Sequence, residues 1–383
     1  MSKLQELIDK LCPNGVEYVK LGEVCNILDS QRKPISKAKR IKGNYPYYGA
    51  NGIQDYISDY IFNGTFLLIG EDGSVINKDN SPVLNWVEGK IWVNNHAHIL
   101  TAKKSNSLRY IYYSLQIQDV SKIVRGVPPK LNQENLKKIE IPLPPIEVQE
   151  EIVRILDNFT KCTAELQAEL QAREEQYEYY RNKLLSFEGR TDVEYKKLGD
   201  IGKICMCKRI LKEQTSLSGD VPFFKIGTFG GEADAYISQE LFDTYKAKYS
   251  YPKKGDILIS ASGTIGRAVV FDGCPSYFQD SNIVWLKHDE SVVLNSYLKY
   301  CYSLNPWTVS TGGTIARLYN NNILNAVIPV PSLTEQERIV NILDKFETLV
   351  KDLSQGLPAE IEARQNQYEF YRNKLLSFKR LTT

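Results

Sequence analysis

The chain has 383 residues, of which 42% are hydrophobic and 25% charged, and its formal net charge is +2. This length exceeds one ordinary domain, and the apolar content is sufficient for folded cores, so we expect at least two globular domains. No apolar run approaches the roughly 20 residues that cross a bilayer, and the start carries no apolar signal segment. The seven cysteines are scattered and without a metal-ligand spacing, which is typical of reduced thiols. A cytoplasmic protein without a membrane span is therefore expected.

Internal repeats organise the chain. Three segments occur twice in the same order: VEYVKLGEV (16–24) and VEYKKLGDI (193–201), EVQEEIVRILDNF (147–159) and TEQERIVNILDKF (334–346), and QYEYYRNKLLSF (176–187) and QYEFYRNKLLSF (367–378). The sequence thus predicts two copies of one frame, each closing with a proline-led helix.

Between the repeated segments the two copies differ. Residues 45–110 and 220–290 share only short β-branched and aromatic runs broken by Gly, Asn and Asp, which are typical of strands and turns. A short helix is expected near the end of each, at 108–118 and 294–303. The predicted fold class is α+β, with two globular units joined by two long helices that form an antiparallel coiled coil around a pseudo-twofold axis. The expected boundaries are a first unit at 1–140, a central helix at 141–190, a second unit at 191–327 and a distal helix at 328–383.

The two helical segments carry an apolar seam. Stepping alternately by four and three residues meets mainly apolar residues over about five heptads, the pattern of a coiled coil. The predicted seam consists of Ile152, Leu156, Phe159, Leu166, Leu170, Tyr177, Tyr180 and Leu184, and then Ile339, Leu343, Phe346, Val350, Leu353, Tyr368, Tyr371 and Leu375. In an antiparallel pair, the QYE segment of one copy should pack against the ILD segment of the other. The alternative is that each helix packs only on its neighbouring domain.

The second helix is expected to be interrupted. Its copy of the repeat carries four extra residues, and Gly356 and Pro358 lie within that stretch. A proline inside a helix removes a hydrogen bond and clashes with the preceding turn. A break or kink is therefore predicted there, with Pro358 able to start a new helix.

Charge is distributed unevenly along the chain. Residues 16–140 hold 17 Lys and Arg against 12 Asp and Glu, and residues 193–327 hold 15 against 13. The helical segments are acidic, with 5 against 9 at 141–187 and 6 against 8 at 328–378. This asymmetry favours a polyanion at the globular units and a protein partner at the helices.

Two stretches have a composition suited to nucleic acid. Residues 32–42 contain six cations and are followed by Tyr45, Pro46, Tyr47 and Tyr48, a mixture suited to phosphates and stacked bases. A solvated loop before a strand is the alternative. SASGTIGR (260–267) offers hydroxyls, flexible backbone and an arginine, although a tight turn explains its glycines equally well.

Catalytic constellations are absent from the sequence. The pair His96 and His98 has no third metal ligand nearby in sequence, which favours a structural role over a metal site. No motif for binding S-adenosylmethionine or for cutting DNA occurs. We therefore expect no catalytic residues, no metal and no cofactor.

Several of these segments together resemble one family. VEYVKLGEV, YPYYGANGI, ISASGTIGR, YFQDSNIVWL, IPLPPIEVQEEIVRILD and QYEYYRNKLL are similar to the specificity subunit of a type I restriction-modification system, over essentially the whole chain. The resemblance implies a non-catalytic subunit in which two target recognition domains each read half of a bipartite, asymmetric double-stranded DNA site. It also implies that the helices set the spacing and dock two methyltransferase subunits, and that restriction subunits join the complex. Adenine-N6 methylation and ATP-dependent cleavage would belong to these partners.

An alternative within the same complex is a scaffold or degenerate regulatory subunit that binds the methyltransferase without reading DNA. For DNA contact the sequence favours cations and amide or hydroxyl side chains. In the first unit these are Arg32, Lys33, Lys39, Arg40, Lys42, Tyr47, Asn51, Arg125 and Lys130, and in the second Lys208, Arg209, Ser262, Thr264, Arg267, Gln279, Asn282 and Arg317.

Overall fold

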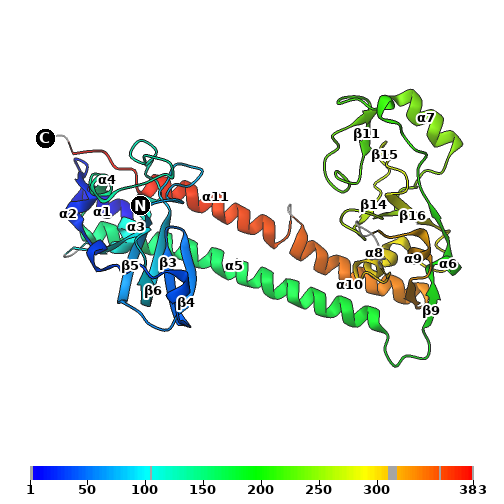
Figure 1. The fold of residues 1–383 in the computed structure, drawn as a ribbon, viewed down its shortest axis with the longest axis horizontal. Helices are drawn as coiled ribbons and strands as arrows, with labels where there is room; N and C mark the ends of the chain where they lie inside the picture. The colour runs from blue at the N-terminus through cyan, green and yellow to red at the C-terminus, as the bar shows by residue number, and fades with distance from the viewer. Residues whose placement is uncertain (1–2, 104–105, 309–316, 353–354, 382–383) are drawn as a thin grey trace. The chain divides into compact units, whose positions relative to one another are not determined.

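The computed structural model describes residues 3–103, 106–308, 317–352 and 355–381. The chain divides into two compact units, one formed by Met1–Gln167 with Glu360–Thr383 and the other by Ala168–Ala359. Figure 1 labels many of the helices and strands of both. Within the described ranges, no helix is both long enough and apolar enough to cross a membrane.

A six-stranded sheet forms the centre of the first unit. Its order is β2 (Cys25–Ile27), β7 (Ala97–Ala102), β5 (Phe62–Gly70), β6 (Leu84–Val93), β3 (Lys42–Gly49) and β4 (Gly52–Ile57). Neighbours are antiparallel except β3 and β6, which are parallel. Successive side chains of a strand point to opposite faces, so Leu67 and Ile69 of β5 enter one apolar cluster and Phe66 and Leu68 another. Both faces of the central strand are therefore buried.

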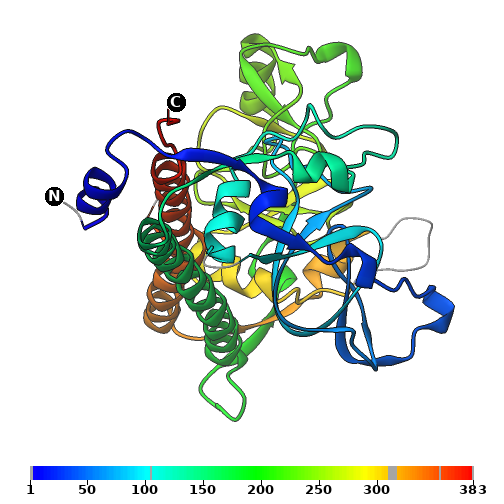
Figure 2. The same ribbon diagram turned by 90° about the vertical axis from the view of Figure 1, so that its left-hand side faces the viewer.

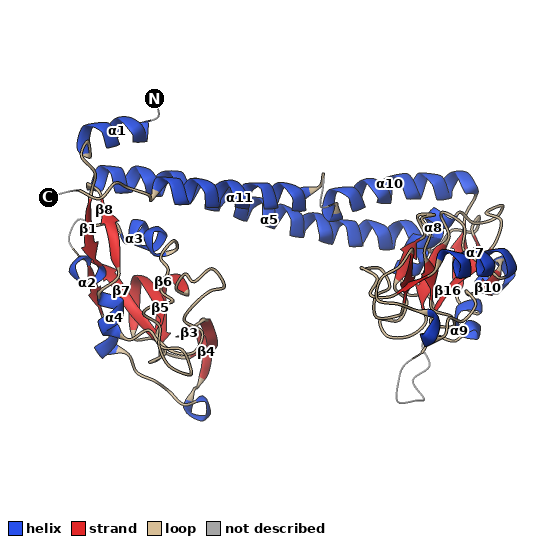
Figure 3. Cartoon of the chain, turned by 90° about the horizontal axis from the view of Figure 1, so that it is seen from above, coloured by secondary structure: helices blue, strands red, loops and turns tan. Residues whose placement is uncertain are grey.

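A strand pair and short helices surround this sheet. β1 (Glu17–Lys20) pairs antiparallel with β8 (Glu140–Leu143), and Figure 3 shows the two as neighbouring red strands. The helices are α1 (Lys3–Leu11), α2 (Leu21–Val24), α3 (Leu108–Leu115) and α4 (Gln133–Lys137), with 3-10 turns η1 (Asp29–Gln31) and η2 (Lys37–Lys39). Side-chain oxygens of Ser107 and Asn132 accept N–H groups from the first turns of α3 and α4, which caps these helices.

The second unit contains two smaller sheets. One has the order β10 (Lys203–Cys205), β16 (Ile283–Lys287), β13 (Ile257–Ser260) and β14 (Ala268–Val270), and the other β12 (Tyr236–Ile237), β11 (Val221–Phe224) and β15 (Tyr277–Phe278). A separate antiparallel pair joins β9 (Glu194–Lys197) to β17 (Val327–Val330). The helices are α6 (Leu198–Ile201), α7 (Gln239–Lys248), α8 (Asn295–Ser303) and α9 (Asn320–Leu324), with the turn η3 (Lys212–Gln214). The predicted α+β content is confirmed.

The repeated sequence segments build the same frame in both units. The pair β1 and β8 of the first unit corresponds to β9 and β17 of the second. Tyr110 of α3 donates a hydrogen bond to the carbonyl oxygen of Pro142 at 2.9 Å, and its counterpart Tyr297 of α8 donates to Pro329 at 3.1 Å. The sheets held by this frame differ in strand number and order. The two units thus share a frame and differ in its contents, as the sequence predicted.

The long helices differ between the two copies. α5 (Ile146–Ser186) is a single helix of 41 residues, whereas the second copy consists of α10 (Leu333–Lys351) and α11 (Leu357–Leu375). The interruption falls at the predicted Gly356. A Cβ there would lie 2.6 Å from a backbone oxygen of α10, so no side chain is tolerated. Pro358 lies in the first turn of α11, where its missing N–H costs no helical hydrogen bond.

In each unit, α5 packs against a helix of the other copy. In the first unit Phe159 of α5 stacks on Tyr371 of α11 with ring centroids 5.5 Å apart. In the second, Tyr180 of α5 stacks on Phe346 of α10 at 5.6 Å. The QYE segment of one copy therefore meets the ILD segment of the other in both units. Helix α1 packs on the same helices of the first unit, and Figure 2 shows it in blue beside the red end of α11.

The predicted seam residues differ in burial. Ile152, Leu156, Tyr177, Ile339, Leu343 and Val350 are buried, whereas Phe159, Leu166, Leu170, Leu184, Phe346, Tyr368 and Leu375 are half-buried. Tyr180 and Tyr371 are each 37% exposed. Leu353 lies outside the described residues. Burial is thus greatest where the helices also contact the globular parts, and lower near Leu166 and Leu170.

Candidate nucleic-acid interface

Exposed lysines line the segment between β2 and β3 of the first unit. Lys33, Lys39 and Lys42 are exposed, and the described part of the chain offers none of them an ion-pair partner. The backbone beneath them is anchored, because the Trp92 indole donates to the carbonyl oxygen of Lys33 at 2.5 Å and the Tyr47 hydroxyl accepts from the Ile35 N–H at 3.0 Å. Free cations on a fixed backbone are suited to phosphate contacts.

Arg32 differs from its neighbours because it is part of the core. Its side chain is 12% exposed and donates to Glu71 at 2.6 Å and to the carbonyl oxygen of Ala97 at 2.8 Å, with Asp29 at 3.6 Å. Burial opposes ionisation of Asp29, but hydrogen bonds from His98 and Gln133 and the charges of His98 and Arg32 outweigh it, so the pKa of Asp29 lies below its usual value. This geometry does not favour the DNA contact expected of Arg32, because its guanidinium is held against two half-buried carboxylates.

Tyr47 is likewise poorly placed for the predicted contact. The ring is 1% exposed and lies on the inward face of β3, so no base can stack on it. Arg40 covers this ring at 4.1 Å from its centroid, pairs with Asp55 at 3.4 Å and donates to the carbonyl oxygen of Ile35 at 3.1 Å. Tyr47 and Arg40 thus hold the cationic segment in place, and the exposed lysines remain its candidate contacts.

Three further candidates of the first unit lie on exposed turns. Asn51 is exposed between β3 and β4. Arg125 and Lys130 exchange two backbone hydrogen bonds, of 2.9 and 2.7 Å, which close a tight loop with Val127 fully exposed at its tip. The Lys130 ammonium lies 3.4 Å from Glu71, and its side chain is 51% exposed. These side chains are accessible to a ligand.

In the second unit, hydrogen bonds bring several predicted residues close together, and one of them, Arg317, lines a small cavity. Ser262 donates to the side-chain oxygen of Asn282 at 2.9 Å, and Arg317 donates to the carbonyl oxygen of Ser281 at 3.1 Å. A cavity of about 360 Å³ is lined by Ser281, Arg317 and residues at the start of α9. Gln279 has a structural bond, because its side-chain oxygen accepts the Ile226 N–H at 2.9 Å. The structure therefore brings Ser262, Asn282 and Arg317 together, with Gln279 on the adjoining strand connection.

Thr264 and Arg267 line a different cavity, one that sequence reasoning missed. It measures about 410 Å³ and is also bordered by Arg181, Lys299 and Lys351 from three helices. These three cations lie far apart in the sequence, in segments that otherwise read as a seam or a short helix, so no local signal marks them. The predicted Lys208 and Arg209 lie elsewhere, exposed after β10, with Lys208 5.2 Å from the ring centroid of Tyr249.

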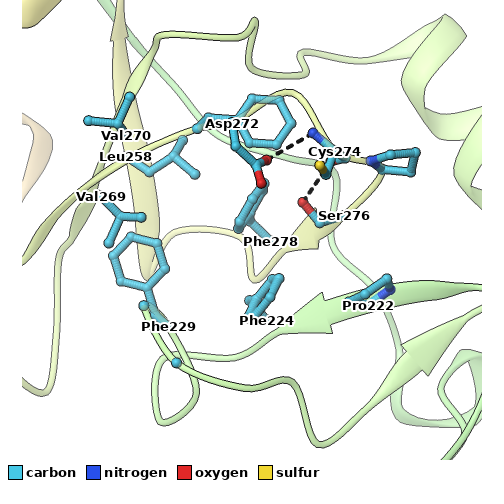
Figure 4. A pocket seen from close by; sticks show the side chains of 14 residues that line it. Pro222, Phe224, Phe229, Leu258, Val269, Val270, Asp272, Cys274, Ser276 and Phe278 are labelled. Atoms are coloured by element: carbon cyan, nitrogen blue, oxygen red, sulfur yellow. Dashed lines mark hydrogen bonds between the residues drawn. The ribbon is translucent and has the colours of Figure 1, made fainter. Parts of the chain in front are cut away.

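A third cavity of the second unit is apolar. It measures about 340 Å³ and lies among Phe224, Phe229 and Phe278, as Figure 4 shows. Its polar rim is satisfied internally, since the Asp272 carboxylate accepts the Cys274 N–H at 2.8 Å and Ser276 donates to the Cys274 carbonyl oxygen at 3.2 Å. With no cation in its lining, this cavity is unsuited to phosphate.

One group of side chains in the described ranges has the geometry of a metal site. Ligand atoms of Asp29, Glu71 and His98 lie within 4.8 Å of one another. The Arg32 guanidinium already contacts both carboxylates, and the His98 ring lies between Asp29 at 2.6 Å and the carbonyl oxygen of Leu131 at 2.8 Å. These contacts make the group a hydrogen-bonded ion network of the core. The two histidines of the pair are separate in the fold, since His96 pairs with Asp72.

Comparison with known proteins assigns this architecture to a family. The sequence matches the type I restriction modification DNA specificity domain twice, over residues 13–175 and 190–363. A Haemophilus influenzae protein named as a type I restriction enzyme specificity subunit is 51% identical, and the match covers 99% of this chain and 100% of that protein. The specificity subunit of EcoR124I and EcoR124II from Escherichia coli is 31% identical, over 99% and 97% of the two chains.

Solved structures share the fold. The S subunit of a type I restriction-modification system from M. genitalium gives a TM-score of 0.60 at 13% identity, over 94% of this chain and 96% of that one. A chain solved in work on complex assembly and conformational transition of the type I restriction-modification system gives 0.56 at 17% identity, over 96% and 98%. With two family matches and full-length relatives of this similarity, the chain belongs to the type I restriction-modification specificity subunits.

Proposed function

We propose that this chain is the DNA-reading subunit of a type I restriction-modification enzyme, with each unit contacting one half of a bipartite, asymmetric double-stranded DNA site. The observation that carries the proposal is one frame repeated around two unlike contents: a six-stranded sheet in one unit, and sheets of four and three strands in the other. The common frame would place each unit on the DNA duplex in the same way, whereas the different sheets and loops would contact different base sequences. The chain itself would be cytoplasmic and non-catalytic, with adenine methylation and ATP-dependent cleavage supplied by the methyltransferase and restriction subunits.

Exposed aromatic rings on the helices support docking of two methyltransferase subunits. Tyr179 is 60% exposed and its counterpart Phe370 is 62% exposed. Tyr179 packs edge-on against Tyr180 at 5.3 Å, and Phe370 packs in the same way against Tyr371 at 5.4 Å. Each outward ring therefore continues the aromatic packing between α5 and a helix of the other copy.

The exposed surroundings of these rings are also alike in the two copies. Glu178, Asn182 and Lys183 are exposed beside Tyr179, and the same three residue types are exposed beside Phe370. Core packing does not require identical exposed side chains, and the sheets of the two units have diverged freely. Two equal surfaces with an aromatic centre suit two copies of one partner, since aromatic side chains are common interface anchors.

The helix shared by the two units supports a role in spacing. α5 contributes residues to both units, and 41 residues of helix extend about 60 Å at 1.5 Å per residue. The tandem repeat of four residues at 163–166 and 167–170 provides a natural unit for changing that length. We propose that the length of α5 sets the number of unread base pairs between the two half-sites.

The proposal is tested by the DNA modification that the chain directs. The chain and its partner methyltransferase are expressed in a host without other adenine methylation, and the methylated positions are mapped by single-molecule sequencing. An interrupted motif with two unlike halves is expected. If the chain co-purifies with the methyltransferase and no motif is methylated, while the same methyltransferase is active with another specificity subunit, then the scaffold or regulatory alternative is correct.

A further inference from the structure

A cavity of the second unit collects positive charge from four separate elements. It measures about 410 Å³ and is bordered by Arg181 of α5, Arg267 from the loop before β14, Lys299 of α8 and Lys351 at the end of α10. All four belong to the second unit. Thr264, on the same loop as Arg267, adds a hydroxyl to the lining.

The charge of this lining is not balanced. Its one carboxylate, Glu347, accepts from Lys299 and lies 3.2 Å from the ammonium of Lys351. Burial raises the pKa of Glu347, but the two lysines lower it further, so the carboxylate is ionised and serves both. Arg181 and Arg267 have no carboxylate partner within the described ranges; they donate to a side-chain amide and to a backbone carbonyl oxygen, at 3.2 and 2.7 Å.

The cations also crowd one another. Arg181 and Lys351 lie 5.6 and 5.2 Å from the centroid of the same ring, Tyr177. An aromatic ring attracts each cation, yet two like charges beside one ring repel, and an anion in the cavity would relieve that repulsion.

The first unit provides a control within the same chain. Arg372 is the counterpart of Arg181 in the repeated QYE segment, and it lines a cavity with Asp79 and Asp119. Hydrogen bonds from Ser81 and, to a smaller extent, the charge of Arg372 hold the pKa of Asp79 below its usual value. The repeated arginine therefore faces carboxylates in one unit and other cations in the second, so the surplus is particular to the second unit.

We infer that this cavity binds a phosphate group of the DNA backbone beside the half-site contacted by the second unit. The inference rests on the proposed function, and it names the chemical group that Arg181, Arg267 and their neighbours contact. Arginine forks and lysine ammonium groups are the usual phosphate donors, and such contacts position a protein without reading sequence. These cations strengthen binding equally at every sequence and leave the choice of bases unchanged.

The test compares three variants of the full chain reconstituted with its methyltransferase: Arg181→Gln with Arg267→Gln, the charge-retaining Arg181→Lys with Arg267→Lys, and Arg372→Gln as matched control. Binding of a fluorescent duplex is followed by anisotropy between about 50 and 200 mM salt, where each phosphate contact contributes a slope of about 0.9 in log affinity against log salt. Because the two arginines contact one phosphate, the double glutamine variant should lose roughly 0.9 of this slope, the lysine variant little, and Arg372→Gln none. The double glutamine variant should methylate the same sequence motif as the wild type.

Other outcomes overturn the inference. An unchanged slope in the double glutamine variant would show that no backbone phosphate binds there, and a motif relaxed at one half-site would make these arginines base readers. Thermal unfolding distinguishes free phosphate from DNA phosphate. If inorganic phosphate stabilises the wild type but not the double glutamine variant, and the salt slope of DNA binding is unchanged in that variant, the cavity binds a small anion. A wild-type complex that methylates no motif would instead contradict the proposed function.

Discussion

Arg32 and Lys33 are adjacent in the chain but differ in burial and in ion pairing. Both belong to one cationic run, yet Arg32 is 12% exposed against carboxylates that are 7% and 14% exposed, whereas Lys33 is exposed and unpaired in the described part of the chain. Arg32→Met keeps most of the side-chain volume and leaves Glu71 and Asp29 without their shared cation. Removing one partner of such a buried pair costs about 3–5 kcal/mol, whereas Lys33→Ala should change the unfolding free energy by less than about 0.5 kcal/mol.

Urea unfolding followed by tryptophan fluorescence measures this difference, because two of the four tryptophans, Trp86 and Trp92, lie in the first unit. With a denaturant slope of about 2 kcal/mol/M, Arg32→Met should lower the urea midpoint of that unit by roughly 2 M. DNA binding should show the opposite order: Lys33→Ala loses about 0.9 of the salt slope, and folded Arg32→Met loses none. A stable Arg32→Met protein with weakened DNA binding would refute the assignment of Arg32 to the core.

Four further outcomes are expected. Inserting one more copy of the four residues at 163–166 lengthens α5 by about 6 Å and rotates the residues after the insertion by about 40°, so methylome mapping should show a different gap and unchanged half-sites. Exchanging residues 193–327 for those of another family member should alter one half of the motif, and a change in both halves would contradict two separate readers. Alanine at Tyr179 or Phe370 should weaken the binding of one of the two methyltransferase subunits by about 30-fold. Native mass spectrometry should then show a complex with one methyltransferase subunit per chain, whereas a complex that keeps two would contradict the role of this ring as an anchor. The folded pKa of Asp29 lies below 3.8, so its stabilisation is present above that pH and is lost as the pH falls through the folded pKa. Asp29→Asn should therefore lose less stability than the wild type between about pH 5 and pH 3.

Much of the architecture was predictable because it depends on local pattern. The repeated VEY, ILD and QYE segments predict the common frame, and the alternation of four and three predicts the helices α5, α10 and α11. Gly356 and Pro358 predict the interruption, since their effect on a helix is a property of the residues themselves. The stacking of Tyr371 on Phe159 also agrees with the pattern, because antiparallel pairing of two equal helices brings the end of one to the start of the other.

The individual contact residues were less predictable. Arg32 and Lys33 are adjacent and carry the same charge, but only Arg32 meets Glu71, which lies on a different strand connection. Tyr47 reads as a stacking residue beside cations, yet its position on the inner face of β3 places it at 1% exposure. The burial of a side chain depends on elements distant in sequence, and composition of a short segment does not contain that information.

The duplication, the helical seam with its break, and the placement of two unlike units in one frame can all be derived from the amino-acid sequence alone. Each of these depends on periodicity or on residues with a fixed backbone preference, so it can be predicted without knowledge of tertiary contacts. Which cations are free is a property of the folded chain. Arg181, Arg267, Lys299 and Lys351 gather around one cavity because four separate elements meet there, and the balance between their charges and Glu347 exists only once those elements have packed together.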